Sequence, residues 1–477
     1  MSNMSDKDSI ESRVSGTITR FGLIDRGDSV LCAISGGPDS VAMAHILHEL
    51  SGELGINLTL AHVNYHTRGS DSNAEESLCR EIAESLDLDI YVSDVSENIL
   101  KSLKTGNFQR NAREYRLDFF RSTASEIGVS KIAIGHTRDD VIESSLMHII
   151  RGSGISGLAG IFPRTGEFVR PVIDCTKDEL IGYLDSNGIG YRIDKSNTTS
   201  DYTRNRVRNE LLPLLEREYN PAIGNSISRL AEIARIFSDY LESEIARLWS
   251  GIVSRSRLGK IIIDLGRFIE IHEFIRFELL RRAYKQLTAD MPDVPSLDYE
   301  LARSALNLLS AYIGTRADLK NGVMIERGNN QLIVFQDECP PFEREIELPG
   351  RIVLPEFNLE LESEIVDNES VKAYESDNWA VTLDYDAVER RCVIRNWREG
   401  DRVYLLGAPG HRKVSDVFID RKIPRSLRSE IPMLISCGEI LWIGGVGISE
   451  KAGIKDKTGK VLKLDARAHV IQDGNTV

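Results

Sequence analysis

A short loop between a buried strand and a helix is the feature that most constrains this chain. The run Val30-Leu31-Cys32-Ala33-Ile34 is apolar and has the length of a buried strand, and Val41 to Leu50 has the spacing of a helix. Between them stands Ser35-Gly36-Gly37-Pro38-Asp39-Ser40. Glycines let backbone N–H groups approach an anion closely, and the positive end of the helix dipole points at the same place. The loop therefore predicts a phosphate site.

The alternative is a glycine-rich turn that only joins strand to helix. The order of strand, Ser-Gly-Gly, acid, Ser and helix favours the phosphate site over that alternative. Ser35 and Ser40 would add hydroxyl donors, whereas Asp39 would need Mg²⁺ to bridge it to phosphate oxygens. The chain has no G-x-x-x-x-G-K-[ST], so it is not a Walker A ATPase. The G-x-G-x-x-G of residues 152–157 follows a helix-like run rather than a strand, so it does not predict a dinucleotide site.

Strand-like and helix-like segments alternate from about residue 27 to residue 140. Further strands are expected at 58–63, 90–92 and 131–134, and helices at 74–86 and 112–127. This order is typical of an α/β fold, a parallel sheet with helices on both faces. Ligands of such sheets bind outside the carboxyl ends of the strands.

The remainder of the chain predicts two further domains. Apolar residues spaced by three and four between 220 and 310 predict a helical middle domain, with strand-like runs near 322–336. Pro340-Pro341 is a plausible linker, and the short β-like segments after about 345 predict a small α+β C-terminal domain. The expected division is 1–215, 216–338 and 345–477.

Composition and charge restrict the class of protein. The six cysteines are scattered without a C-x-x-C pair, which disfavours structural zinc, an iron–sulfur cluster or a disulfide framework. Without an N-terminal apolar segment or an 18-residue apolar run, we expect a cytoplasmic protein outside the membrane. The net charge of −14 hides a contrast, because residues 338–389 carry a net −12 and residues 390–428 a net +7. The second segment predicts a patch that a polyanion would meet.

Polar clusters follow the second and fourth predicted strands. His62-Val63-Asn64-Tyr65-His66-Thr67-Arg68 leaves the second, and the fourth is followed by residues 136–143. Asp139 and Glu143 would share a helix face and could hold Mg²⁺ or an ammonium group. Alone, either cluster would more often be a cap or a solvated face, but both lie on the side of the phosphate loop. Arg204 and Arg208 would also share a face and suit phosphate, with a solvated arginine face as the alternative.

These residues together resemble a known family. Ser-Gly-Gly-x-Asp-Ser resembles the PP-loop of N-type ATP pyrophosphatases, which release pyrophosphate while they adenylate a substrate. The other motifs are similar to those of bacterial tRNA(Ile)-lysidine synthases from about residue 27 to 450, least so in the middle domain. They are Ala61-His62-Val63-Asn64 with Arg68; Asn107-Phe108-Gln109 with Ala112-Arg113 and Arg116; Gly135-His136 with Asp139-Asp140 and Glu143; Arg151-Gly152-Ser153-Gly154 with Gly157-Leu158; Arg170-Pro171; Asp194, Ser196-Asn197, Tyr202, Arg204-Asn205, Arg208 and Leu212-Pro213; residues 395–402; and residues 412–418. Tyr65, Arg110 and Ser144 depart from the family pattern.

The resemblance implies a ligase that forms a C–N bond between lysine and the wobble cytidine of the isoleucine tRNA with a CAU anticodon. ATP is a substrate, Mg²⁺ the cofactor, and the tRNA and L-lysine are partners; a homodimer is allowed, since no feature of the sequence determines the oligomeric state. The residue roles that it implies are catalytic for Asp39, Arg113, Asp139 and Arg204; ATP-binding for Ser35, Gly36, Gly37, Pro38, Asp39, Ser40, Ala61 and His136; lysine-binding for Asp139 and Glu143; tRNA-binding for Asn64, Arg68, Arg208, Arg398, Arg402, Arg412 and Lys413; and metal-binding for Asp39.

Two other classes of function stay open from the sequence: another PP-loop enzyme and a non-catalytic binding protein. A tRNA-thiolating relative would carry reactive or cluster-binding cysteines, whereas Cys32 falls inside a buried strand and Cys79 on a helix. An amidotransferase-type relative would need a glutaminase, of which the chain shows no sign. A non-catalytic tRNA-binding protein that keeps ATP as a regulatory ligand is the alternative from another class. The intact Asp39, Asp139 and Asp140 argue against it.

Overall fold

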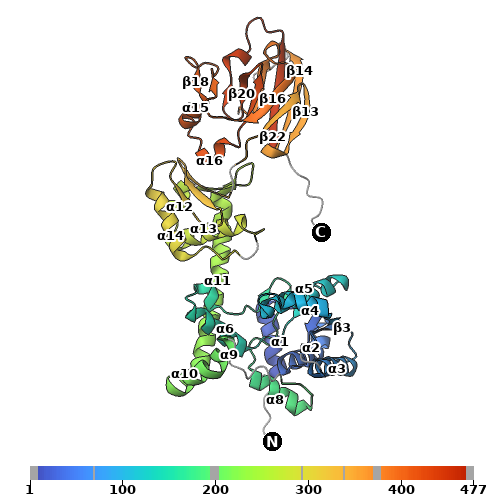
Figure 1. The fold of residues 1–477 in the computed structure, drawn as a ribbon. Coiled ribbons are helices and arrows are strands. Elements are labelled where there is room, and N and C mark those ends of the chain that lie inside the picture. Colours follow the sequence, from blue (N-terminus) through green and yellow to red (C-terminus); the bar gives the residue numbers. More distant parts are fainter. Residues whose placement is uncertain are drawn as a thin grey trace. The chain divides into compact units, whose positions relative to one another are not determined.

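The computed structural model describes residues 9–67, 70–193, 203–291, 294–336, 339–368 and 378–468. It divides into two compact units, Met1–Leu241 and Glu242–Val477, which Figure 1 colours along the chain. Because this division has two parts, it does not decide the predicted division into three domains, which stays a prediction. None of the described helices is both long and apolar enough to span a membrane.

A six-stranded sheet forms the centre of the first unit. Its strand order is β3-β2-β1-β4-β6-β5, and every pairing is parallel except that of β5 with β6. The strands are β1 (Ser29–Ala33), β2 (Asn57–Asn64), β3 (Ile90–Asp94), β4 (Lys131–Ala133), β5 (Arg164–Thr165) and β6 (Phe168–Val169). The chain runs outward from β1 through β2 to β3 and returns to β4 on the other side of β1. Such a reversal of strand order opens a ligand crevice at the carboxyl ends of the two strands.

Helices cover both faces of this sheet. On one face α2 (Pro38–Leu54) packs with α1 (Ile10–Phe21) and α8 (Lys177–Asn187) around a core that includes Cys32 and Leu60. On the other face α5 (Phe108–Glu126) places Phe120 on Leu31 and Ile132. The remaining helices of the unit are α3 (Ser70–Ser85), α4 (Glu97–Leu103), α6 (Arg138–Ile150), α7 (Ile155–Leu158), α9 (Thr203–Arg206), the π-helix η2 (Val207–Leu211) and α10 (Leu212–Glu218). The predicted α/β fold is confirmed.

The second unit begins within α11 (Ile223–Ile252) and starts with helices around a small sheet. The helices are α12 (Leu265–Ile269), α13 (Glu273–Leu287), α14 (Tyr299–Leu306) and the short η3 (Asn307–Ser310). The sheet has the order β7-β8-β11-β10-β9, with strands β7 (Val253–Arg255), β8 (Ile261–Asp264), β9 (Arg316–Asp318), β10 (Met324–Arg327) and β11 (Gln331–Phe335). β10 and β11 are the strands predicted near 322–336.

The C-terminal part is mainly β, with two short helices. A five-stranded sheet consists of β12 (Glu343–Glu347), β16 (Arg391–Asn396), β19 (Pro432–Ser436), β20 (Glu439–Ile443) and β21 (Gly447–Ile448). A four-stranded sheet consists of β13 (Gly350–Leu354), β14 (Leu359–Asp367), β22 (Lys460–Ala468) and β15 (Ala380–Asp384). The rest is the pair β17 (Arg402–Val403) and β18 (Arg412–Lys413), the helices α15 (Val414–Asp420) and α16 (Arg425–Arg428), and the 3₁₀ turns η4 (Pro355–Phe357), η6 (Tyr385–Ala387) and η7 (Glu450–Ala452). The two larger sheets share a core around Trp442 and Phe357, as expected of a small α+β domain.

Candidate active site

The phosphate loop lies at the carboxyl end of β1, as its sequence predicts. Gly36 has φ +79°, a conformation that a residue with a Cβ adopts only under strain. Gly37 is the N-cap of α2 and Pro38 stands in the first turn. Since no side chain caps this helix, its first N–H groups are available to an anion, which the helix dipole also attracts.

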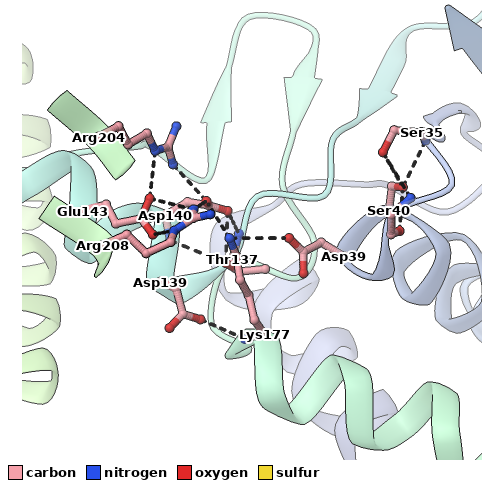
Figure 2. Close-up of polar contacts among 11 residues, drawn as sticks. Ser35, Asp39, Ser40, Thr137, Asp139, Asp140, Glu143, Lys177, Arg204 and Arg208 are labelled. Atoms are coloured by element: carbon pink, nitrogen blue, oxygen red, sulfur yellow. Dashed lines mark hydrogen bonds and ion pairs between the residues drawn. The ribbon is translucent and has the colours of Figure 1, made fainter. Parts of the chain in front are cut away.

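Hydrogen bonds inside the loop fix its shape. The Ser35 N–H donates to Ser40 Oγ at 3.0 Å, and the Ser40 hydroxyl donates to the Gly37 carbonyl at 3.0 Å. The two serine hydroxyls lie 3.1 Å apart (Figure 2). The Ser40 hydroxyl therefore closes the loop on itself in this structure, while Ser35 lies at the surface of the adjoining cavity.

A cavity of about 790 Å³ opens beside the loop. This volume lies within the range of small-molecule sites. Ten predicted site residues line it: Ser35, Gly37, Pro38, Asp39, Ser40, Asn64, Arg113, His136, Arg204 and Arg208. Among the described residues of the first unit, four other predicted ones are not part of its lining: Gly36, Ala61, Asp139 and Glu143. The fold thus gathers the loop, the ends of β2 and β4 and the arginines around one space.

Asp39 is a half-buried carboxylate with one unpaired oxygen. Its Oδ2 lies 3.8 Å from Lys177 Nζ, whereas its Oδ1 is buried without a hydrogen-bond partner. The pKa of Asp39 is raised to about 6, mainly by burial, with Lys177 opposing the rise and the nearby Asp140 and Asp139 contributing to it. A buried carboxylate oxygen without a donor fits a cation ligand. The described residues contain no group of three His, Cys, Asp or Glu side chains that could hold a metal, so phosphate oxygens would have to complete the coordination.

An ion cluster joins the start of α6 to the segment after residue 202. Arg204 donates from Nε to Glu143 Oε2 at 2.7 Å and from Nη2 to Asp140 Oδ1 at 2.8 Å. Arg208 donates to both oxygens of Glu143, at 2.5 and 2.9 Å. Lys177 Nζ lies 3.4 Å from Asp140 Oδ1, between that carboxylate and Asp39 (Figure 2). Three cations therefore share two carboxylates at the edge of the cavity.

Asp140 is fixed from behind by a capping box. Thr137 is the N-cap of α6, and its N–H and hydroxyl both donate to Asp140 Oδ2, at 2.8 and 3.0 Å. Burial alone would raise the pKa of Asp140, but Lys177, Arg204 and the Thr137 N–H hold it below its usual value. Asp140 is thus an ionised anchor for the cations around it.

The structure separates the two carboxylates that the sequence paired. Asp139 turns away from the cluster, and its Oδ2 accepts the Lys177 backbone N–H at 2.8 Å. Glu143 is 1 % exposed and holds the two arginines. Because helical spacing gives a shared face but not the neighbours of that face, the sequence could not show that Glu143 meets arginines first.

Arg113, Arg170 and His136 also line the cavity. His136 Nδ1 accepts the Arg170 Nε–H at 3.0 Å, and burial lowers the pKa of His136 to about 4, so the ring is neutral. Burial, Arg116 and Arg204 lower the pKa of Arg113. Like charges gathered at one wall favour an anionic ligand such as a phosphate.

Gly135 allows the end of β4 to approach the loop. A Cβ at this position would lie 3.0 Å from the Asp39 carbonyl oxygen and 3.1 Å from Ser40 Cα, both backbone atoms. Only glycine fits this approach without displacing the loop. The glycine of the Gly135-His136 motif is therefore required by the packing of β4 against the loop.

The chain is similar to known proteins over most of its length. Residues 9–215 match the model of a PP-loop domain, and residues 392–464 match that of a TilS substrate C-terminal domain. The tRNA(Ile)-lysidine synthase of Caldanaerobacter subterraneus subsp. tengcongensis is 30% identical over 458 residues, covering 95% of this chain and 97% of that protein. The chain belongs to the tRNA(Ile)-lysidine synthase family. The tRNA(Ile)-lysidine synthase of Clostridioides difficile is also 30% identical, covering 96% of this chain and 99% of that protein. The resemblance drawn from the sequence is confirmed.

The residues expected at the tRNA are dispersed. Asn64 is 2 % exposed, and its amide donates to Glu76 Oε2 at 2.9 Å. Arg398, Arg402, Arg412 and Lys413 belong to the second unit; Arg402 and Lys413 are exposed and face each other across β17 and β18, whereas Arg412 donates to Asp420 at 2.6 Å. Arg68 and the motif residues Asp194, Ser196, Asn197 and Tyr202 lie outside the described residues. Their roles stay predictions.

Sequence reasoning assigned no role to Lys177 and none to the Arg170–His136 bond. Lys177 opens α8 behind the N-cap Thr176. Its only sequence signal is a lysine in a first helical turn, where the helix dipole disfavours a cation. A lysine at this disfavoured position could have predicted that an anionic group lies near it. Arg170 appeared within the family motif, but nothing in the sequence shows that it donates to a histidine.

Proposed function

We propose that this chain joins L-lysine to carbon 2 of the wobble cytidine of the isoleucine tRNA with a CAU anticodon. The reaction forms a C–N bond, consumes ATP, releases AMP and pyrophosphate, and changes the codon read from AUG to AUA. The observation that carries the proposal is the similarity to synthases of this name over 95% of the chain, with the phosphate loop inside it.

The first step activates the base. Cytosine's 2-oxo oxygen attacks the α-phosphorus of ATP, a P–O bond forms, and pyrophosphate leaves. The N–H groups of Gly36, Gly37 and the first turn of α2 would bind the phosphates, with Ser35, Ala61 and His136 at the nucleotide. Arg113 would stabilise charge that develops on the transferring group, supported by its position in the cavity wall.

Mg²⁺ fits beside Asp39. The buried, unpaired Oδ1 and the absence of a larger acidic cluster in the described residues suit an ion held by one carboxylate and phosphate oxygens. When bound, Mg²⁺ would neutralise phosphate charge. Lys177, 3.8 Å from Asp39 Oδ2, would keep that carboxylate ionised and oriented.

The second step transfers lysine. The ε-ammonium first gives one proton to solvent, the neutral ε-amine attacks carbon 2 to form the C–N bond, AMP leaves with the former 2-oxo oxygen, and the new C–N nitrogen gives a second proton to solvent. Asp139 and Glu143 are the carboxylates proposed for the lysine ammonium. Since Glu143 binds Arg204 and Arg208 in this structure, an ammonium there would replace an arginine contact. Arg204 would then be free to contact phosphate, which gives it its proposed catalytic role.

The tRNA would be held by both units. The cytidine must leave its stack, which is easiest in the single-stranded anticodon loop. Asn64, Arg68 and Arg208 are proposed near the base, and Arg398, Arg402, Arg412 and Lys413 on the phosphate backbone. We place this activity in the cytoplasm, where tRNA is modified. We also propose that the chain forms a homodimer.

The alternatives are less well supported. A thiolase would need a reactive thiol, yet burial raises the pKa of Cys32 and of Cys79 to about 12. A non-catalytic ATP-regulated tRNA-binding protein would not need the buried acidic and basic groups that surround the loop.

One assay tests the proposal. Purified chain is incubated with ATP, Mg²⁺, radiolabelled lysine and a transcribed isoleucine tRNA bearing CAU. We expect label in the tRNA and equal release of AMP and pyrophosphate, each requiring both lysine and tRNA. A tRNA with the wobble cytidine replaced by uridine is the control. Label in neither tRNA would contradict the proposal.

A further inference from the structure

A smaller cavity lies in the second unit, between the start of α13 and α14. Its volume is about 190 Å³, the scale of one small ring system rather than of a nucleotide. His272, Phe274, Phe277, Tyr299 and Arg303 are among its lining residues. None of the roles proposed above uses it.

One wall of this cavity is aromatic. The rings of Phe277 and Tyr299 have centroids 5.0 Å apart, and those of Phe274 and Phe277 are 6.4 Å apart. Phe277 is buried at 7 % exposure, whereas Tyr299 leaves 52 % of its surface in solvent. A buried ring thus supports an exposed one. The two rings are tilted by 56°, so the surface for a planar ligand is the face of the exposed Tyr299 ring itself.

The rim offers donors and an acceptor. His272 is the N-cap of α13, and its Nδ1 accepts the Phe274 N–H at 3.2 Å, so in the neutral ring the proton is on Nε2. Arg303 is exposed and follows Tyr299 by four residues on α14, which places both on one helix face. No described residue pairs with Arg303 in an ion pair or hydrogen bond. Glu273 adds a carboxylate at the same rim.

We propose that this cavity binds one unpaired nucleobase of the tRNA, stacked on Tyr299, with Arg303 at the adjoining phosphate. Unpaired RNA bases are bound by stacking on aromatic side chains and by hydrogen bonds to their edges. His272 Nε2–H and Glu273 match the acceptors and amino groups of a base edge, and the guanidinium complements a phosphodiester. A larger apolar occupant would exceed the cavity. The inference rests on the proposed function for the identity of the RNA.

Filter binding of the full-length chain to the transcribed isoleucine tRNA tests the site. Tyr299→Ala should weaken binding about tenfold, the effect of losing roughly 1.4 kcal/mol of stacking. Tyr299→Phe, the matched control, should stay within twofold of the parent. The salt dependence should be unchanged in Tyr299→Ala, because no phosphate contact is lost. Arg303→Gln should lower the slope of log K against log salt by about one.

Two results would overturn the inference. Tyr299→Ala and Arg303→Gln could both bind tRNA like the parent, or Tyr299→Phe could weaken binding as much as Tyr299→Ala. Thermal unfolding of each variant verifies that it is folded, and Arg303→Gln replaces only an exposed side chain should Tyr299→Ala fail to fold. If the parent incorporates lysine while these variants bind normally, the site is wrong and the function stands. If the parent binds tRNA through Tyr299 but incorporates no lysine, the function is wrong and the site stands.

Discussion

At the scale of single residues, burial determines which charges near the loop can act. Asp140 and Glu143 are buried and Asp39 is half-buried, but only Asp140 and Glu143 have close guanidinium partners. An ionised carboxylate without such partners is costly to bury. Asp39 is therefore the residue whose charge a bound cation would stabilise most.

Replacing Asp39 tests this assignment. Asp39→Asn keeps the shape of the side chain but removes the charge, so AMP and pyrophosphate release should fall by at least about a hundredfold, or about 2.7 kcal/mol in the barrier. Binding of tRNA should stay nearly unchanged, since the change is small and local. Normal turnover of Asp39→Asn would remove it from the catalytic residues.

His136 predicts a dependence of stability on pH. Its pKa is lowered to about 4 in the fold by burial, against an ordinary value of 6.5. As pH falls from 6.5 towards 4, the unfolded chain takes up a proton that the folded chain does not, so this residue makes the fold less stable. His136→Gln, which keeps an acceptor for Arg170, should reduce that loss by up to about 1.4 kcal/mol per pH unit. Urea unfolding of both proteins at pH 7, 6 and 5 measures their free energies of unfolding. The opposing contribution of Asp39 is common to both proteins and cancels in the difference between them. Parallel plots of this free energy against pH would contradict the prediction.

Glu143 and Asp139 can be separated by their neutral variants. Glu143→Gln should raise the KM for lysine and leave that for ATP nearly unchanged. It should also destabilise the fold by about 1–3 kcal/mol, because Arg204 and Arg208 lose a charged acceptor. Asp139→Asn, outside the arginine cluster, should affect stability less. If neither variant changes the KM for lysine, neither carboxylate belongs to the lysine site.

At the scale of elements, longer segments were predictable and very short ones were not. The strand at 30–34 and the helices at 41–50 and 112–127 are observed as β1, α2 and α5, because their hydrophobic periodicity extends over enough residues. β5 and β6 have two residues each, too few for a period to show. The candidate site was predictable where it depends on a local motif, as in residues 35–40. It was not where it depends on pairing between distant segments, as with Lys177 and Asp39.

Gly135 tests the contact between β4 and the loop. Gly135→Ala would place a methyl group against the Asp39 and Ser40 backbone and displace the loop. We expect kcat/KM for ATP to fall between about tenfold and a hundredfold, the effect of a small misplacement at a reacting centre. Gly182→Ala on α8 is the matched control, since a Cβ there meets no atom within 4 Å. It should stabilise the helix by about 0.5–1 kcal/mol with unchanged kinetics; equal kinetics for both variants would contradict the prediction.

At the scale of the whole molecule, charge segregation along the sequence is partly cancelled by strand pairing. The acidic strand β12 lies antiparallel to the basic strand β16, with Glu343 opposite Arg395 and Glu347 opposite Arg391. Glu347 and Arg391 form an ion pair at 3.4 Å. Part of the acidic segment is thus the counterpart of part of the basic one. The basic groups left for a polyanion are those beyond this ladder.

We therefore expect the exposed pair Arg402 and Lys413 to make the strongest contacts with the tRNA phosphates. Changing both to Gln should weaken tRNA binding and lower the slope of log K against log salt by about one for each lost phosphate contact. Arg412→Gln should have a smaller effect, because Asp420 already compensates Arg412 at 2.6 Å. Arg391→Gln is the control on the same domain, since its charge is paired with Glu347. Binding curves from low to high salt separate these cases. A slope that is unchanged in the double variant, or lowered equally by Arg391→Gln, would place the tRNA on another surface.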